Sequence, residues 1–242
     1  MTTATLFDDV EVAAAYADHR GIADETFMDE VARSLGAPSG LVADIGAGTG
    51  TPATALAARG YDVIAVEPSP AMIAEGIRRC PDVAFVRGVA EDLPLPDTSC
   101  DGVLLLYVLH HTEDPEAVLA EARRVARPAG RVIVVSGSHD CARQRLFSSY
   151  FPILAPDLPD AEEISIYARA AGLRLTGVRA VEHWVYPNRT IDDAYIRMVS
   201  TEMFAALRRL HEAEFAEGLS RLRADLGQPL PPARVSLLTL ER

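Results

Sequence analysis

The chain contains no lysine, because all 23 of its basic residues are arginine. Without a lysine side chain the protein cannot form a Schiff base, anchor pyridoxal phosphate or present the lysine of a Walker-type phosphate loop. Cysteine is scarce as well, with three residues and no CxxC spacing. A disulfide framework or a structural zinc site is therefore not expected, and we predict no metal site.

Positive charge is in the minority, since 35 acidic residues against 23 basic ones give a formal net charge of −12. Affinity for nucleic acid comes largely from neutralising phosphates with Lys and Arg, so this balance disfavours a nucleic-acid partner. No apolar run approaches the roughly 18 residues of a membrane span, and the first residues lack the pattern of a signal peptide. We therefore expect a cytoplasmic protein without a membrane partner.

The most informative segment is VADIGAGTG, residues 42–50. Its apolar residues predict a short buried parallel strand over Leu41–Ile45, with the carboxylate of Asp44 near the strand end. Three glycines follow at alternate positions, where they allow a sharp turn and the close approach of a ligand: Gly46, Gly48 and Gly50. Pro52 suits the first turn of a helix, so a ligand on this turn would meet a helix N-terminus.

A dinucleotide-binding fold uses a related GxGxxG turn, which keeps a nicotinamide-dependent oxidoreductase open as an alternative. Here the third glycine comes one residue early, and Asp44 would repel a pyrophosphate. The segment resembles motif I of the class I S-adenosylmethionine-dependent methyltransferases, whose ligand carries an ammonium and a sulfonium but no phosphate. The resemblance implies S-adenosylmethionine as the cofactor, bound by Asp44 and the three glycines.

Glu67 follows the second predicted strand, Tyr61–Val66. An acid at this place in nucleotide-binding α/β folds accepts the ribose hydroxyls. Strand-end acids can instead cap the next helix, but Ser69 is a better cap for a helix that starts at Pro70. The resemblance therefore assigns Glu67, with the adjacent Pro68, to the cofactor site.

A third block, RGVAEDLPLPD at residues 87–97, also resembles the family. The resemblance implies that the Ala90 backbone and the Glu91 carboxylate lie against the adenine amino edge. Many relatives have an acid where this chain has Val89, so the contact is expected at Glu91 or Asp92. A proline loop with no ligand role is the alternative interpretation.

Strands and helices continue to alternate after this block, which predicts a mostly parallel sheet with helices on both faces. The expected fold is a doubly wound, seven-stranded α/β sheet of Rossmann-like methyltransferase type, with an antiparallel last strand and a helical lid. The remaining predicted strands and helices are Val83–Val86, Gly102–Leu109, Pro115–Ala126 with Asp114 as its cap, Arg131–Ser136, Ala161–Ala171, Leu173–Tyr186 and Arg234–Leu240.

Three segments fall outside the sheet pattern and are expected to cover it. They are an N-terminal helical cap over residues 1–36 and lid insertions near 140–160 and 188–228. The chain then divides into a cofactor-binding half, 37–139, and a C-terminal half, 140–242. Nine of the fifteen Phe, Tyr and Trp residues lie beyond residue 140, which favours either an apolar or aromatic acceptor pocket or ordinary packing of lid helices.

In the first segment, Tyr16 and Arg20 are four residues apart and share a helix face if a helix forms there. Relatives with a YxxxR pattern before motif I use such residues over the methionine end of the cofactor, so the resemblance implies that Arg20 pairs with its carboxylate and Tyr16 lies beside it. A surface Arg packed along Tyr is the alternative.

Tyr107, His110 and His111 are expected at the carboxyl end of the fourth strand, where doubly wound sheets hold their chemistry, and Tyr107 is also expected to contact the cofactor. His110 or His111 could take a proton from an acceptor. The alternative is that at least one of them is structural, and His111 is the first candidate for that role. Further candidates are His139, Asp140 and the hydroxyl of Tyr150. The expected function is methyl transfer from S-adenosylmethionine to a small-molecule acceptor. A cofactor-binding regulator or cyclisation catalyst of the same fold remains an alternative.

Overall fold

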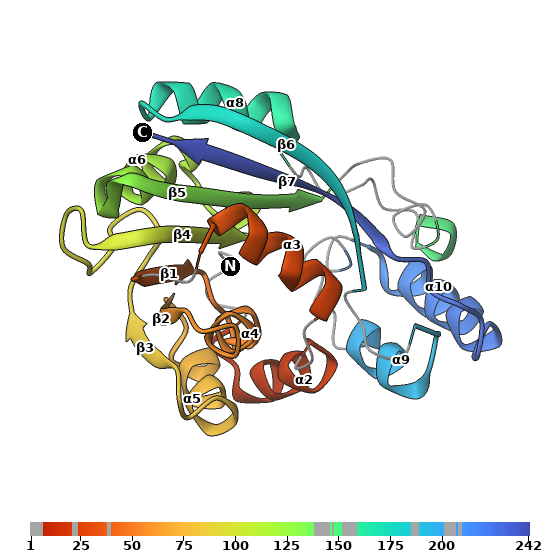
Figure 1. Cartoon of the computed structure of the whole chain (residues 1–242). Helices are drawn as coiled ribbons and strands as arrows, with labels where there is room; N and C mark the ends of the chain where they lie inside the picture. The colour runs from red at the N-terminus through yellow and green to blue at the C-terminus, as the bar shows by residue number, and fades with distance from the viewer. Residues whose placement is uncertain are drawn as a thin grey trace.

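The computed structural model describes residues 7–20, 24–37, 40–137, 146, 148–151, 159–184, 189–200, 207 and 210–242. A seven-stranded sheet runs through the molecule in the order β3-β2-β1-β4-β5-β7-β6 (Figure 1). Its strands are β1 (Leu41–Ile45), β2 (Asp62–Glu67), β3 (Ala84–Arg87), β4 (Cys100–Leu106), β5 (Ala126–Gly137), β6 (Arg174–His183) and β7 (Ala233–Glu241). β7 pairs antiparallel with β5 and β6, and the other pairings are parallel, which confirms the predicted sheet.

Helices cover both faces of the sheet because the central strands are apolar on both sides. In β4, Val103 and Leu105 pack in the hydrophobic cluster that includes α6 (Pro115–Val125) and α8 (Ala161–Ala170). Leu104, between them, packs in the opposite cluster with α3 (Glu25–Leu35) and α4 (Thr51–Ala57). The doubly wound arrangement follows from this alternation.

Two predicted helix starts are confirmed by their caps. The Ser69 hydroxyl accepts the Met72 N–H at 3.1 Å at the start of α5 (Pro70–Arg79). Asp114 accepts the Ala117 N–H at 3.0 Å at the start of α6. Each cap satisfies a backbone donor that has no partner within its own helix.

The predicted strand Gly102–Leu109 is wrong at its end, because β4 stops at Leu106. Tyr107 still donates its N–H to the Val135 carbonyl at 3.0 Å, but its φ of 58° turns the chain out of the sheet. A 3₁₀ turn, η1 (Leu109–His111), follows. Both histidines of this segment therefore lie beyond the sheet.

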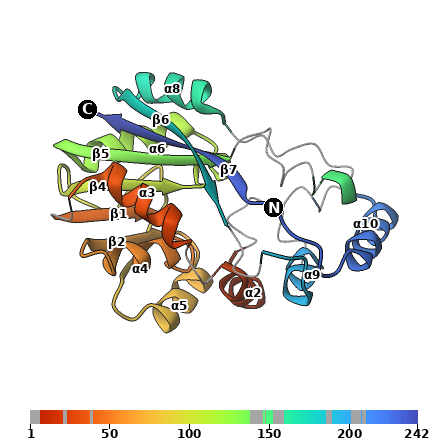
Figure 2. The same ribbon diagram turned by 45° about the vertical axis from the view of Figure 1, so that its right-hand side comes forward.

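Three further helices lie beside the edge at which β4 and β5 end: α2 (Val10–Arg20), α9 (Asp193–Ser200) and α10 (Glu212–Ala224) (Figures 1 and 2). We call these three helices the lid. Residues of α9 and α10, with Tyr150 and Phe151, form a hydrophobic cluster separate from the two sheet clusters, and Tyr16 of α2 packs against it. α3, by contrast, packs its Phe27 and Val31 into a sheet cluster. Among the described residues, no helix is long and apolar enough to cross a membrane.

Candidate active site

The glycine turn after β1 adopts a backbone that only glycine takes without strain. Gly46, Gly48 and Gly50 have φ values of 66°, 57° and 78°. A Cβ on Gly46 would lie 2.8 Å from Cγ2 of Val108, and one on Gly50 would lie 2.6 Å from Cζ of Phe85. The turn therefore needs glycine for its conformation and for close packing, and it leads directly into the N-terminus of α4.

Asp44 is buried in β1, with 1% of its surface exposed. The Ala53 N–H donates to its carboxylate, but Oδ2 has no hydrogen-bond partner among the described residues. Burial, together with the negative charge of Glu67, raises the pKa of Asp44 to about 7. A buried carboxylate oxygen without a partner is costly, and an ammonium group from a ligand would remove that cost.

Glu67, at the end of β2, is also buried and is held by two backbone donors. Its Oε2 accepts the Gly48 N–H at 2.9 Å, and its Oε1 accepts the Ser69 N–H at 3.0 Å. Burial raises the pKa of Glu67 even though both bonds favour the anion. Each carboxylate oxygen can accept a second hydrogen bond, so the side chain can still receive two ribose hydroxyls.

The block at residues 87–97 forms a turn followed by a braced loop. Ala90 is buried and Glu91 half-buried at the turn. Arg124 of α6 donates to the carbonyls of Leu93 and Leu95 at 2.9 and 2.8 Å. Sequence reasoning missed Arg124, since no spacing links it to this loop.

Nearby, the Pro68 carbonyl accepts a bond from Arg87 Nε at 3.2 Å. Pro68 is half-buried and directly precedes Ser69, the residue that caps α5. This bond links the residue after β2 to the last residue of β3. The bond thus holds the chain directly after Glu67 against the end of β3.

The N-terminal segment lies over the glycine turn. A Cβ on Gly48 would lie 3.6 Å from Cε1 of Tyr16, so the tyrosine ring covers this glycine. The Ser69 hydroxyl donates to the Phe7 carbonyl at 2.6 Å, and the Phe7 ring packs edge-on to Tyr16 at 5.8 Å. Arg20 is the last residue of α2, and its side chain lies outside what the structure describes.

Tyr107, His110 and His111 lie on either side of Val108 in the chain, and the Val108 side chain packs against Gly46 of the glycine turn. The two imidazoles are 3.9 Å apart, and His111 meets Phe7 edge-on at 6.2 Å.

Of the other candidates, His139 and Asp140 fall outside the described residues. The Tyr150 hydroxyl donates to Asp225 at 2.6 Å, and burial with this bond raises the pKa of Tyr150 to about 12. Tyr150 is therefore tied into the lid. Among the aromatic residues beyond residue 140, Phe151, Tyr195 and Phe215 share its cluster, while Tyr167 packs against the sheet. Phe147, Tyr186 and Phe204 lie outside the described residues.

A pair that sequence reasoning missed lies at the end of β6. His183 is buried and stacks on Phe27 with ring centroids 4.1 Å apart, and its ring is 6.0 Å from that of Tyr107. Its Nδ1 lies 3.9 Å from Oδ2 of Asp24, the residue that caps α3. The two residues are too far apart in the sequence for any motif to link them. In the described ranges, no group of three or more His, Cys, Asp or Glu residues is arranged to hold a metal ion.

This sheet order, with a glycine turn between two strand-end carboxylates, defines a Rossmann-like methyltransferase fold. Residues 43–134 match the family model described as a methyltransferase domain. This match to a methyltransferase domain agrees with the resemblance of the motifs to the class I S-adenosylmethionine-dependent methyltransferases.

One similar protein is the demethylmenaquinone methyltransferase of Beutenbergia cavernae, 45% identical over 106 residues, which are 43% of this chain and 44% of that protein. The chain thus matches less than half the length of this relative. A solved structure from Anabaena variabilis, described as a methyltransferase from an antibiotic biosynthesis pathway, has a TM-score of 0.70 at 24% identity, covering 89% of this chain and 97% of its own. The [4+2]-cyclase SpnF has a TM-score of 0.67 at 18% identity, covering 100% and 97%. The two structures support the fold alone.

Proposed function

We propose that the chain transfers the methyl group of S-adenosylmethionine to a small-molecule acceptor and releases S-adenosylhomocysteine. The observation that carries this proposal is the pair of buried carboxylates, Asp44 and Glu67, at the ends of two adjacent strands beside the glycine turn. One of them has an oxygen without a partner in the described part of the chain, and the other can accept a further hydrogen bond on each oxygen. Together they suit a ligand with an ammonium group and two vicinal hydroxyls.

The residues fit this cofactor along its length. Asp44 would hold the ammonium group, Glu67 the ribose hydroxyls, and Glu91 with the Ala90 backbone the adenine amino edge. The glycine turn and Pro68 would line the centre of the site. Tyr16 lies over the turn and would cover the methionine end, where Arg20 would pair with the carboxylate.

When bound, the cofactor supplies a methyl group that its sulfonium has already activated. The residues of the chain therefore have to hold the acceptor in line with the methyl group and to exclude water. Tyr107, His110 and His111 are the proposed residues beside the acceptor, and a base is needed only if the acceptor carries a proton. The lid, whose side chains form a hydrophobic cluster of their own, would cover the acceptor at the same edge.

The first acceptor to test is demethylmenaquinone, the substrate named by the relatives. Mass spectrometry should detect one added methyl group on the acceptor and an equal amount of S-adenosylhomocysteine. A protein that binds S-adenosylhomocysteine but methylates no acceptor of this kind would favour the alternative of a regulator or cyclisation catalyst. The likeness of fold to SpnF is the reason to keep that alternative.

Glu67→Gln tests the cofactor site independently of the acceptor. Loss of the charge should weaken the binding of S-adenosylhomocysteine by roughly 1.5–3 kcal/mol, the range for a hydrogen bond to a charged group. Calorimetry measures this loss, with Asp62→Asn at the exposed start of the same strand as the matched control. A folded Glu67→Gln protein with unchanged affinity would contradict the ribose assignment.

A further inference from the structure

We propose that α2 is a gate over the cofactor site and that Arg79, in the last turn of α5, holds this gate closed. The proposal rests on the proposed methyl transfer and concerns the regulation of the same site. Cofactor enters and leaves only after the contacts between Arg79 and α2 have broken, so the rate of exchange depends on ionic strength. None of the motifs that mark the cofactor site includes Arg79.

α2 covers the part of the glycine turn that the sheet leaves uncovered. Two glycines of the turn pack against side chains from β3 and from the segment after β4. Gly48 instead faces Tyr16 of α2, with 3.6 Å between Cε1 of the ring and a Cβ placed on the glycine. Of the described elements around the turn, α2 is thus the one that can move away without opening the core of the sheet.

The segment before α2 lies beside the second carboxylate of the site. The Ser69 hydroxyl donates to the Phe7 carbonyl at 2.6 Å, while the Ser69 N–H donates to Glu67 at 3.0 Å. The Phe7 ring packs edge-on to Tyr16 at 5.8 Å. Phe7 and Tyr16 therefore lie across both the turn and the end of β2, where the cofactor is proposed to bind.

α2 is held in this position by little apolar burial. It has 11 residues, and among its described side chains only Ala13 and Ala17 are buried. A helix shorter than roughly 12–15 residues is marginal without tertiary contacts. An alanine methyl buries little apolar area, so polar contacts have to provide much of the stabilisation of α2.

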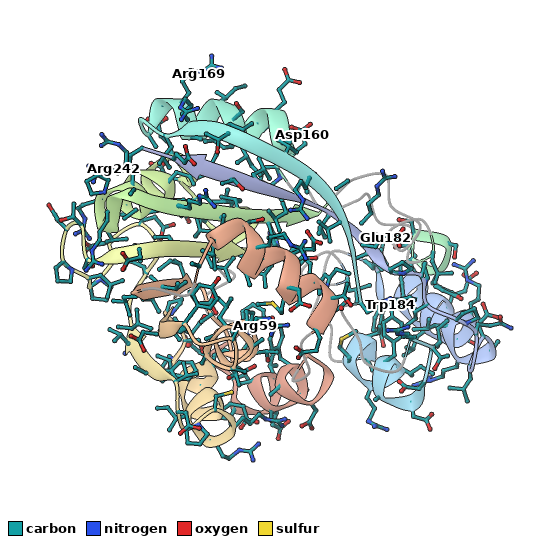
Figure 3. The ribbon with its side chains drawn as sticks, in the orientation of Figure 1. Arg59, Asp160, Arg169, Glu182, Trp184 and Arg242 are labelled. Carbon is teal, nitrogen blue, oxygen red and sulfur yellow. The ribbon has the colours of Figure 1, made fainter. Side chains whose placement is uncertain are left out.

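α3 shows the opposite case at the same side of the sheet. It buries larger side chains, among them Phe27, Met28 and Val31. Arg59, just after α4, also donates to the Asp29 carboxylate of α3 at 2.9 and 2.7 Å (Figure 3). α3 is therefore a fixed part of the structure, whereas α2 is attached more weakly.

Arg79 provides polar contacts of this kind from α5. Its Nε donates to Glu75 in the same helix, which leaves both terminal nitrogens for α2. Nη1 donates to the Ala17 carbonyl at 3.5 Å, and Nη2 pairs with the Asp18 carboxylate. The Ala17 carbonyl is one of the last four of α2, which have no partner within the helix, and a cation is favourable at this end. We call the contacts of Arg79 with Ala17 and Asp18 the latch.

The latch lies on one side of α2, and the lid cluster lies on the other. Ala15 and Tyr16 pack against the hydrophobic cluster that α9 and α10 form. Figure 2 shows α2 between α5 and α9. The latch therefore joins the covering helix to a helix of the sheet, and its loss leaves the contacts of α2 with the lid in place.

The latch is partly exposed, which limits its strength and makes it sensitive to salt. Of the Arg79 and Asp18 side chains, 29% and 66% are exposed. An ion pair of this kind changes an equilibrium by about two- to fivefold, and dissolved salt screens it. A latch of this strength slows the opening of α2 without preventing it.

The latch is made by residues of the chain alone and lies outside the proposed cofactor contacts. It should therefore hold α2 equally well with and without cofactor. Loss of the latch should raise the association and dissociation rate constants by the same factor and leave their ratio, the Kd, unchanged. A residue that binds the cofactor behaves differently, because its loss mainly raises the dissociation rate constant and with it the Kd.

Surface plasmon resonance with immobilised protein and S-adenosylhomocysteine measures both rate constants. Arg79→Gln should raise each of them by about two- to fivefold. Arg78→Gln is the matched control, because it removes the same charge from the same helix while Arg78 donates to Glu75, at 3.0 Å from Nε, and not to α2. This control should exchange cofactor at the wild-type rates.

Two further measurements separate the latch from a general effect of charge. Asp18→Asn should speed up exchange by no more than Arg79→Gln, and the double variant should be no faster than Arg79→Gln alone. Raising the salt concentration from about 0.05 to 0.5 M should bring the rates of wild type and Arg78→Gln toward those of Arg79→Gln. The rates of Arg79→Gln itself should change little.

Equal rate constants for Arg79→Gln and Arg78→Gln would overturn the proposal. Faster dissociation with unchanged association in Arg79→Gln would also overturn it, since that result would place Arg79 among the residues that bind the cofactor. Wild-type rates that do not depend on salt would have the same consequence. Failure of the wild type to bind S-adenosylhomocysteine would instead contradict the proposed function.

Discussion

Asp44 should couple cofactor binding to the loss of a proton near neutral pH. Its carboxyl is buried beside Glu67, and its pKa is raised to about 7 in the empty site. A ligand ammonium binds the ionised form, so binding must first remove the proton from molecules that still carry it. Affinity for S-adenosylhomocysteine, which keeps the ammonium group, should therefore rise with pH and level off above the pKa.

The size of the effect follows from the ionised fraction. One unit below the pKa about a tenth of the molecules carry the anion, and one unit above it nearly all of them do. Affinity should therefore be about tenfold weaker at pH 6 than at pH 8, or about 1.4 kcal/mol. Asp44→Asn should weaken binding at pH 8 and remove the pH dependence.

The free energy of unfolding should fall as the pH rises, in the opposite direction to the affinity for S-adenosylhomocysteine. The pKa of Asp44 is raised above its unfolded value of 3.8, so the unfolded chain loses this proton first as the pH rises. Folded protein without cofactor should lose about 1.4 kcal/mol per pH unit from this group between about pH 4 and pH 7, and no more above that. Asp44→Asn should thus be the more stable protein at neutral pH, by a few kcal/mol at most.

Calorimetry between pH 6 and 8, in buffers with different ionisation enthalpies, measures both the affinity and the released proton. Denaturant unfolding without cofactor measures how the free energy of unfolding changes with pH. Glu67→Gln provides an internal check, because removing the neighbouring charge should lower the Asp44 pKa and move the midpoint to lower pH. Affinity independent of pH, with no proton released, would refute the assignment of Asp44 to the ammonium group.

Three further predictions concern the scaffold of the site. Gly50→Ala should lower the free energy of unfolding by roughly 2–5 kcal/mol, because the backbone is left-handed there and the new Cβ would clash with Phe85. Gly227→Ala, where nothing lies within 4 Å of the new Cβ, should cost only the backbone strain, roughly 1–2 kcal/mol, and equal costs in denaturant unfolding would contradict this prediction. Arg124→Lys should loosen the loop that Arg124 holds and weaken the binding of S-adenosylhomocysteine several-fold in calorimetry. Unchanged affinity would show that this loop does not contribute to cofactor binding. Amides of residues 10–20 should gain hydrogen-exchange protection when S-adenosylhomocysteine binds, since Tyr16 covers Gly48; equal protection would make α2 a fixed part of the core.

The cofactor half was predictable from sequence because its signals are local. Strand β1, the glycine turn and α4 follow one another within a few residues, and each has its own physical requirement. Glycine is needed for the positive φ, an apolar run for the buried strand, and a capping hydroxyl at Ser69 for α5. In a parallel sheet, consecutive strands are usually neighbours, so these local signals also indicate which strand ends lie next to one another.

The end of β4 was predicted wrongly for an equally physical reason. The run from Gly102 to Leu109 is apolar, and nothing in its composition marks the turn at Tyr107. Tertiary contacts decide it, since Tyr107 still bonds to Val135 while Val108 packs against Gly46. An apolar run reports burial, and burial continues here after the strand has ended.

The contacts at the other end of the sheet edge were less predictable because their residues come from segments with no periodic relation to one another. Asp24 precedes α3, Tyr107 follows β4 and His183 ends β6, and the sheet order alone brings them to one edge. Their types are unremarkable in sequence, since an Asp before a helix is an ordinary cap and a His in a strand an ordinary core residue. The signals of the glycine turn thus lie along the chain, whereas the contacts among Asp24, Tyr107 and His183 depend on the packing of segments that are far apart in it.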